Sequence, residues 1–394
     1  MTGQISGVSE RPLRIMLVAG EPSGDALGAQ IMAQLKAITQ GRVTLIGVGG
    51  RDMRAMGLQS LFSIDETAVM GVRDVAPRFL QLLSRIRQTA SFAIEHKPDI
   101  CVLIDSTDFM RRVAGRIKKH APGLKVVKYV SPQIWASRPG RAKAMARVFD
   151  HILCLFDFEV PMYEKVGLAA TFVGNPVIER APPPGLGAAL RERLHLTPSD
   201  RVIVLLPGSR RSEIRFLWPV FREAVERTLA ATGPATLILP TVQTVAAQVR
   251  EAVAAWGRRV LITEDTTEKW AAFEAANVAL AASGTVATEL ALTATPTVVG
   301  YKVGWLTAAG ARRIMTVKYI TLLNIILDRP AIPEFVQEEC TAENLSREMI
   351  SLLTNPVVRM TQIGAAEEAL RKLGHGAEQP SSRAARAILA LSGR

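Results

Sequence analysis

Short runs of aliphatic and β-branched residues recur along the chain and alternate with segments of helical length. The first runs, at residues 13–19, 43–48 and 100–104, are almost entirely apolar. Strands of a parallel sheet are covered on both faces, so they appear in sequence as continuous apolar runs. Between the second and third runs, residues 78–97 place apolar side chains on one helical face. The alternation predicts the repeated βα unit of a parallel sheet with right-handed crossovers.

Two such series follow one another. Further strands of the first are expected at 126–130, 152–156 and 171–173, and those of the second at 202–206, 235–239, 259–262, 278–281 and 297–300. A Pro- and Gly-rich stretch lies between them at 180–187, and 394 residues exceed what one core usually organises.

We therefore expect an α/β fold with two doubly wound, Rossmann-like domains. Their predicted limits are 1–175 and 176–355, with C-terminal helices in 356–394. Two such domains facing across a cleft form the GT-B architecture, in which ligands bind outside the carboxyl ends of the strands.

Cysteine usage and hydropathy indicate the cellular compartment of the chain and whether it spans a membrane. The three cysteines are odd in number and far apart, which argues against a disulfide framework or a zinc site. The polar start lacks the apolar core of a secretory signal, and no run of about eighteen apolar residues occurs. We expect a cytoplasmic protein that does not span a membrane.

The net charge of +12 is concentrated in one region, because residues 110–149 contain eleven lysines and arginines and no acidic residue. Such a region attracts polyanions, which include nucleic acid, an anionic membrane leaflet and a phosphorylated substrate. The alternative is a solvated helix face. Few aromatic residues interleave the basic ones, which argues against nucleic-acid binding.

Carboxylates follow two strands of the first series. Glu21 and Asp25 lie in the AGEPSGD segment after the first strand, and Asp105 and Asp108 lie in IDSTDF after the third. A carboxylate just past a buried strand is placed to act as a general base, so Asp105 and Glu21 are the catalytic candidates. The alternative for Asp105 is an Asx-turn or helix cap, and Asp25 is better explained by stabilisation at a helix N-terminus.

A third polar segment, YVSPQIWA, follows the next strand and supplies Ser131 and Gln133. An aromatic residue beside cations suits a sugar or a lipid headgroup. Packing of Trp135 at a domain edge is an equal alternative.

Two segments of the second series suit a nucleotide. Arg210, in LPGSRRSEI after the strand at 202–206, offers a planar guanidinium for phosphate, with a surface ion pair as the alternative. Ser283, Gly284 and Thr285 follow the strand at 278–281 and open a helix, where free N–H groups hold a pyrophosphate. Glu289, one turn further on, is placed to accept ribose hydroxyls, unless the segment is an ordinary capped helix.

Eight segments occur in an order that resembles the lipid-A-disaccharide synthase family. They are AGEPSGDALGA, AVMGV, IDSTDF, YVSPQIWA, LPGSRRSEI, ASGTVATEL, VVGYK and IPEFVQEEC. The resemblance implies an inverting GT-B transferase that joins UDP-2,3-diacylglucosamine to 2,3-diacylglucosamine 1-phosphate through a β-1,6 bond and releases UDP. It assigns the general base to Asp105 and UDP binding to Arg210 and the Ser283–Thr285 turn, with Glu289 near the ribose. Asn324 and Gln337 match polar positions near the site.

The five scattered histidines, the lack of a D-x-D string and the helix-terminus phosphate site predict that no metal is needed, and the missing dinucleotide and P-loop motifs argue against a cofactor. The acylated substrates that the resemblance implies place the chain at the cytoplasmic face of the inner membrane as a peripheral protein. The basic region and the segment 303–327 are expected at the anionic surface, with a core helix as the alternative for that segment. A homodimer is left open. The sequence departs from the family pattern at Thr107, Ser137, Asn175 and Leu323, so we assign these positions no role. Other readings are another UDP-sugar GT-B enzyme, such as a peptidoglycan glycosyltransferase or an epimerase, and a non-catalytic basic nucleic-acid-binding protein.

Overall fold

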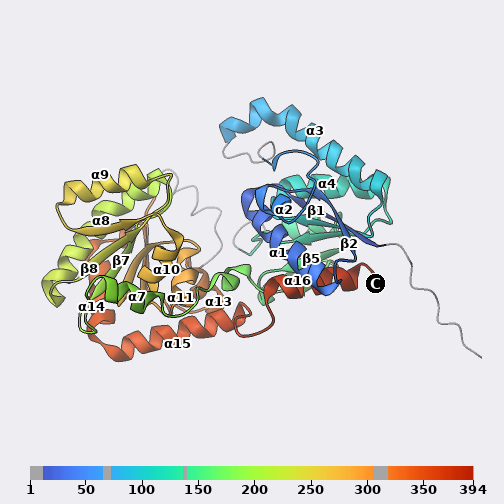
Figure 1. Cartoon of the computed structure of the whole chain (residues 1–394). Coiled ribbons are helices and arrows are strands. Elements are labelled where there is room, and N and C mark those ends of the chain that lie inside the picture. Colours follow the sequence, from blue (N-terminus) through green and yellow to red (C-terminus); the bar gives the residue numbers. More distant parts are fainter. Residues whose placement is uncertain (1–11, 65–71, 136–139, 305–317, 394) are drawn as a thin grey trace, which may run out of the picture. The chain divides into compact units, whose positions relative to one another are not determined.

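The computed structural model describes residues 12–64, 72–135, 140–304 and 318–393 (Figure 1). It contains two compact units. The first comprises Met1–Pro176 together with Ala377–Arg394, and the second comprises Val177–Gly376. Each unit has its own open, six-stranded, parallel sheet covered by helices.

The sheet of the first unit has the order β2-β1-β3-β4-β5-β6. Its strands are β1 (Leu13–Ala19), β2 (Val43–Val48), β3 (Ile100–Ile104), β4 (Val126–Tyr129), β5 (His151–Cys154) and β6 (Ala169–Phe172). Its helices are α1 (Pro22–Ile38), α2 (Arg51–Ala55), α3 (Val72–His96), α4 (Thr107–His120), α5 (Arg141–Ala146), α6 (Val160–Glu164), a short 3₁₀ turn (Asp157–Glu159) and α16 (Pro380–Leu391).

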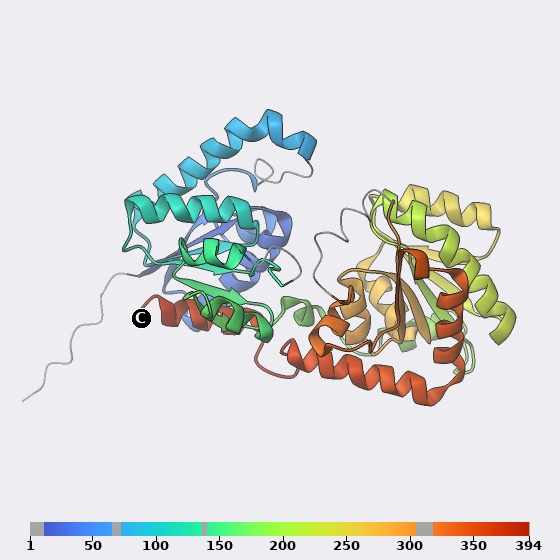
Figure 2. The ribbon, with the colours of Figure 1, turned by 180° about the vertical axis from the view of Figure 1, so that it is seen from behind.

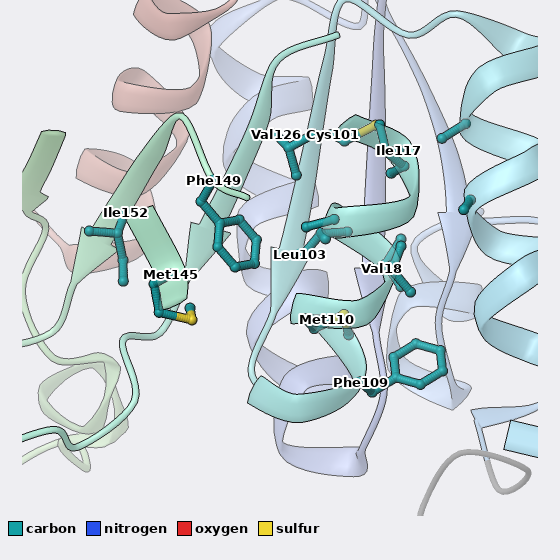
Figure 3. Packing of buried hydrophobic residues seen from close by; sticks show 14 of the residues in the cluster. Val18, Cys101, Leu103, Phe109, Met110, Ile117, Val126, Met145, Phe149 and Ile152 are labelled. Atoms are coloured by element: carbon teal, nitrogen blue, oxygen red, sulfur yellow. The ribbon is translucent and has the colours of Figure 1, made fainter. Parts of the chain in front are cut away.

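Alternate residues of each strand face opposite helix layers. Met16 and Val18 pack under α3, α4 and α5, whereas Ile15 and Leu17 pack under α1 and α16. In Figures 1 and 2 α3 and α4 lie on one side of this sheet and the red α16 on the other. Figure 3 shows the first of these cores, with Met110 of α4 against the strands. This double covering explains the continuous apolar runs.

The sheet of the second unit has the order β12-β11-β10-β7-β8-β9. Its strands are β7 (Val202–Leu206), β8 (Thr236–Pro240), β9 (Val260–Thr263), β10 (Val278–Ala282), β11 (Thr297–Tyr301) and β12 (Glu334–Val336). Its helices are α7 (Leu186–Arg193), α8 (Arg211–Thr232), α9 (Ala246–Trp256), α10 (Thr266–Ala275), α11 (Val286–Leu292), α13 (Leu322–Leu327), α14 (Ala342–Thr354) and α15 (Pro356–Lys372), with 3₁₀ turns at Pro176–Arg180 and Gln337–Glu339.

The predicted α/β class and all eleven predicted strands are confirmed, with small shifts at their ends. The strand β12 was missed, because its three residues, Glu-Phe-Val, carry little of the apolar signal. Two terminal helices form as predicted. In the structure α15 belongs to the second unit and α16 to the first, so the C-terminal residues return to the N-terminal sheet.

Candidate active site

Strand register brings three loops of the first unit to one edge. Ala19 pairs with Ile104, and Ile104 pairs with Tyr129. Strands β1, β3 and β4 therefore end level with one another. The segments that follow them, GEPSGD, DSTDF and VSPQIW, lie side by side at the carboxyl edge of the sheet, where α/β proteins bind ligands.

Glu21 and Asp105 are brought together at this edge by two hydroxyl groups. The Ser23 hydroxyl donates to Asp105 Oδ2 at 2.7 Å, and the Ser106 hydroxyl donates to Glu21 Oε1 at 2.8 Å. The close approach depends on Gly20, because a Cβ there would lie 2.8 Å from the Ser106 hydroxyl oxygen. Each candidate carboxylate is thus held by the loop of the other. The N-cap of α4 is Ser106, whose side chain makes no capping hydrogen bond among the described residues, and the Asp105 carboxylate accepts from Ser23 of α1.

Three residues of these loops have left-handed backbone. Asp105 has φ of +54°, Ser106 has +33° and Val130 has +68°. Such conformations are uncommon for residues other than glycine, and for a β-branched valine they are outliers. Each costs roughly 1–3 kcal/mol and persists only where surrounding contacts impose it.

Lys128 supplies those contacts from beneath the loops. Its side chain is fully buried, and Nζ donates to the Asp105 carbonyl at 2.6 Å and to the Tyr129 carbonyl at 2.9 Å. These carbonyls belong to the peptides that enter Ser106 and Val130. Burial lowers the pKa of Lys128 from 10.5 to about 7, although the carboxylates of Asp105 and Glu21 favour the charged form.

The sequence analysis placed Lys128 in the basic surface region, and that assignment is wrong, because its exposure is 0%. The missed signal was a single lysine inside the apolar run at 126–130. A cation in a buried strand needs acceptors within the fold, and here they are backbone carbonyls of the loops.

The segment after β4 is fixed by Glu159, a second residue that sequence reasoning missed. Trp135 Nε1 donates to Glu159 Oε1 at 3.1 Å, and the Phe156 amide donates to Oε2 at 3.2 Å. The Trp135 ring packs edge-on against Phe156 and Phe158, which favours the packed reading of this tryptophan. Burial raises the pKa of Glu159 from 4.5 to about 7, against these hydrogen bonds. A glutamate soon after the strand at 152–156 was the available signal.

Three further residues that the sequence singled out in the first unit are Asp25, Ser131 and Gln133. Asp25 is buried, and its carboxylate accepts from the amides of Gly50, Asp52 and Met53. It therefore has a structural role at a helix N-terminus, but the helix is α2 and not α1, in which it lies. Ser131 is buried and Gln133 is exposed.

Arg210 in the second unit stands at the start of α8. Its guanidinium donates to Glu213 Oε1 at 2.9 Å, while Glu213 Oε2 accepts from the amides of Ser209 and Arg210 at 2.9 and 3.2 Å. The Arg210 side chain is 78% exposed, so it remains accessible to a ligand despite this ion pair. Gly208 has φ of +118°, and a side chain there would overlap Glu213. Glu213 therefore shapes the turn that presents Arg210.

The Ser283–Thr285 turn follows β10 and leads into α11. Gly284 and Thr285 are exposed, and the Ser283 hydroxyl donates to the Ile320 carbonyl at 3.4 Å. Glu289 is only 8% exposed. Its carboxylate accepts from Lys269 Nζ at 2.9 Å and lies 3.6 Å from an Arg180 guanidinium nitrogen. Glu289 is thus a partly buried anion held by two cations beside the turn.

Asn324 and Gln337 use their amides on backbone groups. The Asn324 amide exchanges two hydrogen bonds of 2.8 Å with Ile332, and Gln337 accepts from the Val303 amide at 2.8 Å and donates to its carbonyl at 3.2 Å. Asn324 is fully buried. Both side chains hold loops of the second unit in place, a role that their sequence positions alone did not reveal.

The basic region of residues 110–149 presents less unpaired positive charge at the surface than its sequence suggests. Lys118 pairs with Asp150 at 2.7 Å and Arg141 with Asp108 at 3.6 Å, two aspartates just outside the acid-free stretch. Arg138 lies outside the described residues, as do Trp305, Leu306 and Ile314 of the predicted interfacial segment. At its described end Tyr319 and Leu323 are buried.

No helix within the described ranges is long and apolar enough to cross a membrane.

Comparison with solved structures defines the class of the fold. A putative UDP-N-acetylglucosamine 2-epimerase from Listeria monocytogenes superimposes with a TM-score of 0.60 at 14% identity, covering 96% of this chain and 95% of that one. The glycotransferase of kitacinnamycin gives 0.60 at 16% identity, covering 97% and 99%. With its two open parallel sheets, the chain therefore has the GT-B fold of glycosyltransferases and related epimerases.

The sequence comparisons then identify the family. A family model described as lipid-A-disaccharide synthetase matches residues 15–388. The lipid-A-disaccharide synthase of Rhodospirillum centenum is 43% identical over 379 residues, which covers 96% of this chain and 94% of that protein. The chain belongs to the lipid-A-disaccharide synthase family and is a glycosyltransferase. The resemblance and the enzyme class predicted from the sequence are confirmed.

Proposed function

We propose that the chain transfers 2,3-diacylglucosamine from UDP-2,3-diacylglucosamine to the 6-hydroxyl of 2,3-diacylglucosamine 1-phosphate. The observation that carries this proposal is the Asp105 carboxylate, which stands on a strained turn at the carboxyl edge of the first sheet, beside the loop that carries Glu21. A general base must be oriented toward the hydroxyl that it deprotonates. The Ser23 hydroxyl and the Lys128 ammonium or amine fix the Asp105 turn from two sides.

In this mechanism Asp105 takes the proton of the acceptor 6-hydroxyl as the oxygen attacks the anomeric carbon. The new C1–O6 bond forms on the face opposite the breaking bond to UDP, so the α-linked donor gives a β-1,6 product. Glu21, joined to the Asp105 turn through Ser106, stands where it holds an acceptor hydroxyl. Positioning of this kind lowers the barrier because the reacting groups are held in the geometry of attack.

The second unit would bind the UDP group. Arg210 is exposed on its turn and offers its guanidinium to the diphosphate. Gly284 and Thr285 offer backbone N–H groups and a hydroxyl, and Glu289 is the acceptor for ribose hydroxyls. Charge neutralisation by arginine and N–H groups requires neither a metal ion nor a cofactor.

The substrates imply work at a membrane surface, because both carry acyl chains. We propose peripheral attachment at the cytoplasmic face of the inner membrane, supported by exposed cations such as Arg116 and Arg147. No nucleic-acid partner is proposed. A homodimer is compatible with this function and is not required by it.

UDP release measured with and without acylated acceptor tests the proposal. Release that depends on 2,3-diacylglucosamine 1-phosphate is the expected result. Release of UDP without acceptor, together with an epimerised sugar, would instead support a UDP-sugar epimerase, the class of one structural neighbour.

A further inference from the structure

A cavity of about 480 Å³ opens in the first unit between the N-terminal ends of α4 and α5. Its lining includes Thr107, Asp108 and Arg111 from α4 and Arg141, Ala144 and Met145 from α5. The proposed function leaves these residues unused. The cavity volume lies within the range of small-molecule sites in proteins.

The cavity joins an apolar floor to a cationic mouth. Met145 is 1% exposed and belongs to the hydrophobic core, where Figure 3 shows it beside the strands. Arg141 lies 3.6 Å from Asp108, whereas Arg111 has no carboxylate partner within the described part of the chain. Two guanidinium groups and one carboxylate leave a net positive charge. Such a site suits a molecule that carries a phosphate and apolar groups together.

The location connects the cavity to the reaction. Thr107 is two residues from Asp105, and only Ser106 separates the proposed base from the cavity wall. Because α4 begins at Thr107, its first turn sets both the Asp105 loop and the cavity. A molecule bound in the cavity would contact the first turn of α4, which directly follows the Asp105 turn in the chain.

We infer that this cavity binds the acceptor substrate, with the acceptor phosphate at Arg111 and Arg141 and the apolar part of the acylated sugar over Ala144 and Met145. The inference rests on the proposed function and adds the subsite for one of its two substrates. Asp108 weakens the site by pairing with Arg141 and by repelling phosphate.

Steady-state kinetics in neutral detergent micelles test the inference with two acceptors, 2,3-diacylglucosamine 1-phosphate and the same sugar without its phosphate. Arg111→Gln and Arg141→Gln should each raise the acceptor KM about 10-fold or more with the phosphorylated acceptor, as expected for loss of a charged hydrogen bond. With the phosphate-free acceptor, wild type and variants should have equal KM values. The KM for the UDP-sugar should not change.

A matched control is Arg112→Gln, which removes an exposed arginine of the same helix that does not line the cavity. It should leave both KM values unchanged. Asp108→Asn gives an effect of opposite sign, a lower KM for the phosphorylated acceptor, which general damage to the fold would not produce.

Three results would overturn the inference. One is an equal rise in KM for both acceptors, which indicates a structural role for the arginines. Another is a rise in the KM for the UDP-sugar, which indicates that the arginines do not act on the acceptor alone. The third is an effect of the variants that appears only when anionic phospholipid is present, which indicates a site for lipid headgroups. If wild type makes no disaccharide from either acceptor, the proposed function itself fails. That result is separate from a failure confined to the variants.

Discussion

Replacing Lys128 with methionine should loosen the Asp105 turn without leaving a large cavity in the hydrophobic core. Methionine fills most of the volume of the lysine stem but has no donor for the carbonyls of Asp105 and Tyr129. The Tyr129 carbonyl keeps the Asp105 amide as a donor at 3.1 Å. The Asp105 carbonyl is then the group that chiefly loses its partner.

The expected loss of stability in Lys128→Met has two sources, the Asp105 carbonyl that loses its donor and the titration of the buried Lys128 side chain. An unsatisfied buried carbonyl costs roughly 1–3 kcal/mol. The pKa of Lys128 is about 7 in the folded chain and 10.5 ordinarily. Between about pH 7 and pH 10.5 the unfolded chain binds one more proton at this lysine than the folded chain does. The free energy of unfolding of the wild type therefore rises as pH increases through this range and falls as pH decreases through it. From pH 6 to pH 9 the wild type should gain roughly 2.7 kcal/mol relative to Lys128→Met.

Urea denaturation of both proteins at pH 6 and pH 9 measures this difference. Lys128→Met should fall furthest below wild type at pH 9, and its turnover should drop by roughly 10²-fold because the base is misplaced. Lys119→Met, at an exposed position of α4, is the control and should match wild type. A stability difference that is the same at both pH values, with turnover intact, would refute the role of Lys128 as a buried, titrating clamp.

Four further predictions concern the site and its surroundings. Asp105→Asn should lower turnover by roughly 10²- to 10⁴-fold with little change in stability; full activity in this variant, with a comparable loss in Asp108→Asn, would reverse the assignment. Burial raises the pKa of Glu159 from 4.5 to about 7, so the folded chain binds the extra proton between those values, and wild type should lose about 2.5 kcal/mol relative to Glu159→Gln from pH 5 to pH 8. Equal urea midpoint shifts at the two pH values would count against this. Chelation by EDTA should leave transfer unchanged, because arginine and N–H groups are proposed to hold the diphosphate; activity restored by magnesium would contradict it. Raised salt should release the protein from anionic vesicles in sedimentation assays, and Gln at both Arg116 and Arg147 should weaken binding at low salt, whereas equal binding to neutral vesicles would exclude the electrostatic part.

The sequence predicted the parts of the fold that depend on local pattern. Apolar runs and the residues that follow them placed the strands, and the level ends of β1, β3 and β4 then followed from parallel pairing. This is why Glu21 and Asp105 were found together. The three-residue β12 carried too little pattern to be found.

Contacts between distant segments could not be predicted in the same way. Lys128 looked like one more cation of a basic stretch, because nothing local reveals that carbonyls of two loops surround its ammonium group. Asn324 and Gln337 were expected near the ligand, yet each amide is satisfied by a backbone residue brought near it by the fold. Pairing with Asp108 and Asp150 likewise reduced the basic field once the chain had folded.

Mass spectrometry of the product made from defined substrates shows directly whether the chain joins the two acylated sugars. Purified chain would be incubated with UDP-2,3-diacylglucosamine and 2,3-diacylglucosamine 1-phosphate whose acyl chains differ in mass, and the product would be fragmented across its glycosidic bond. We expect one disaccharide 1-phosphate, β-1,6 linked, with the donor's acyl chains on the distal sugar and one UDP released for each disaccharide. A product with the acceptor's chains on the distal sugar, or UDP release without any disaccharide, would contradict it.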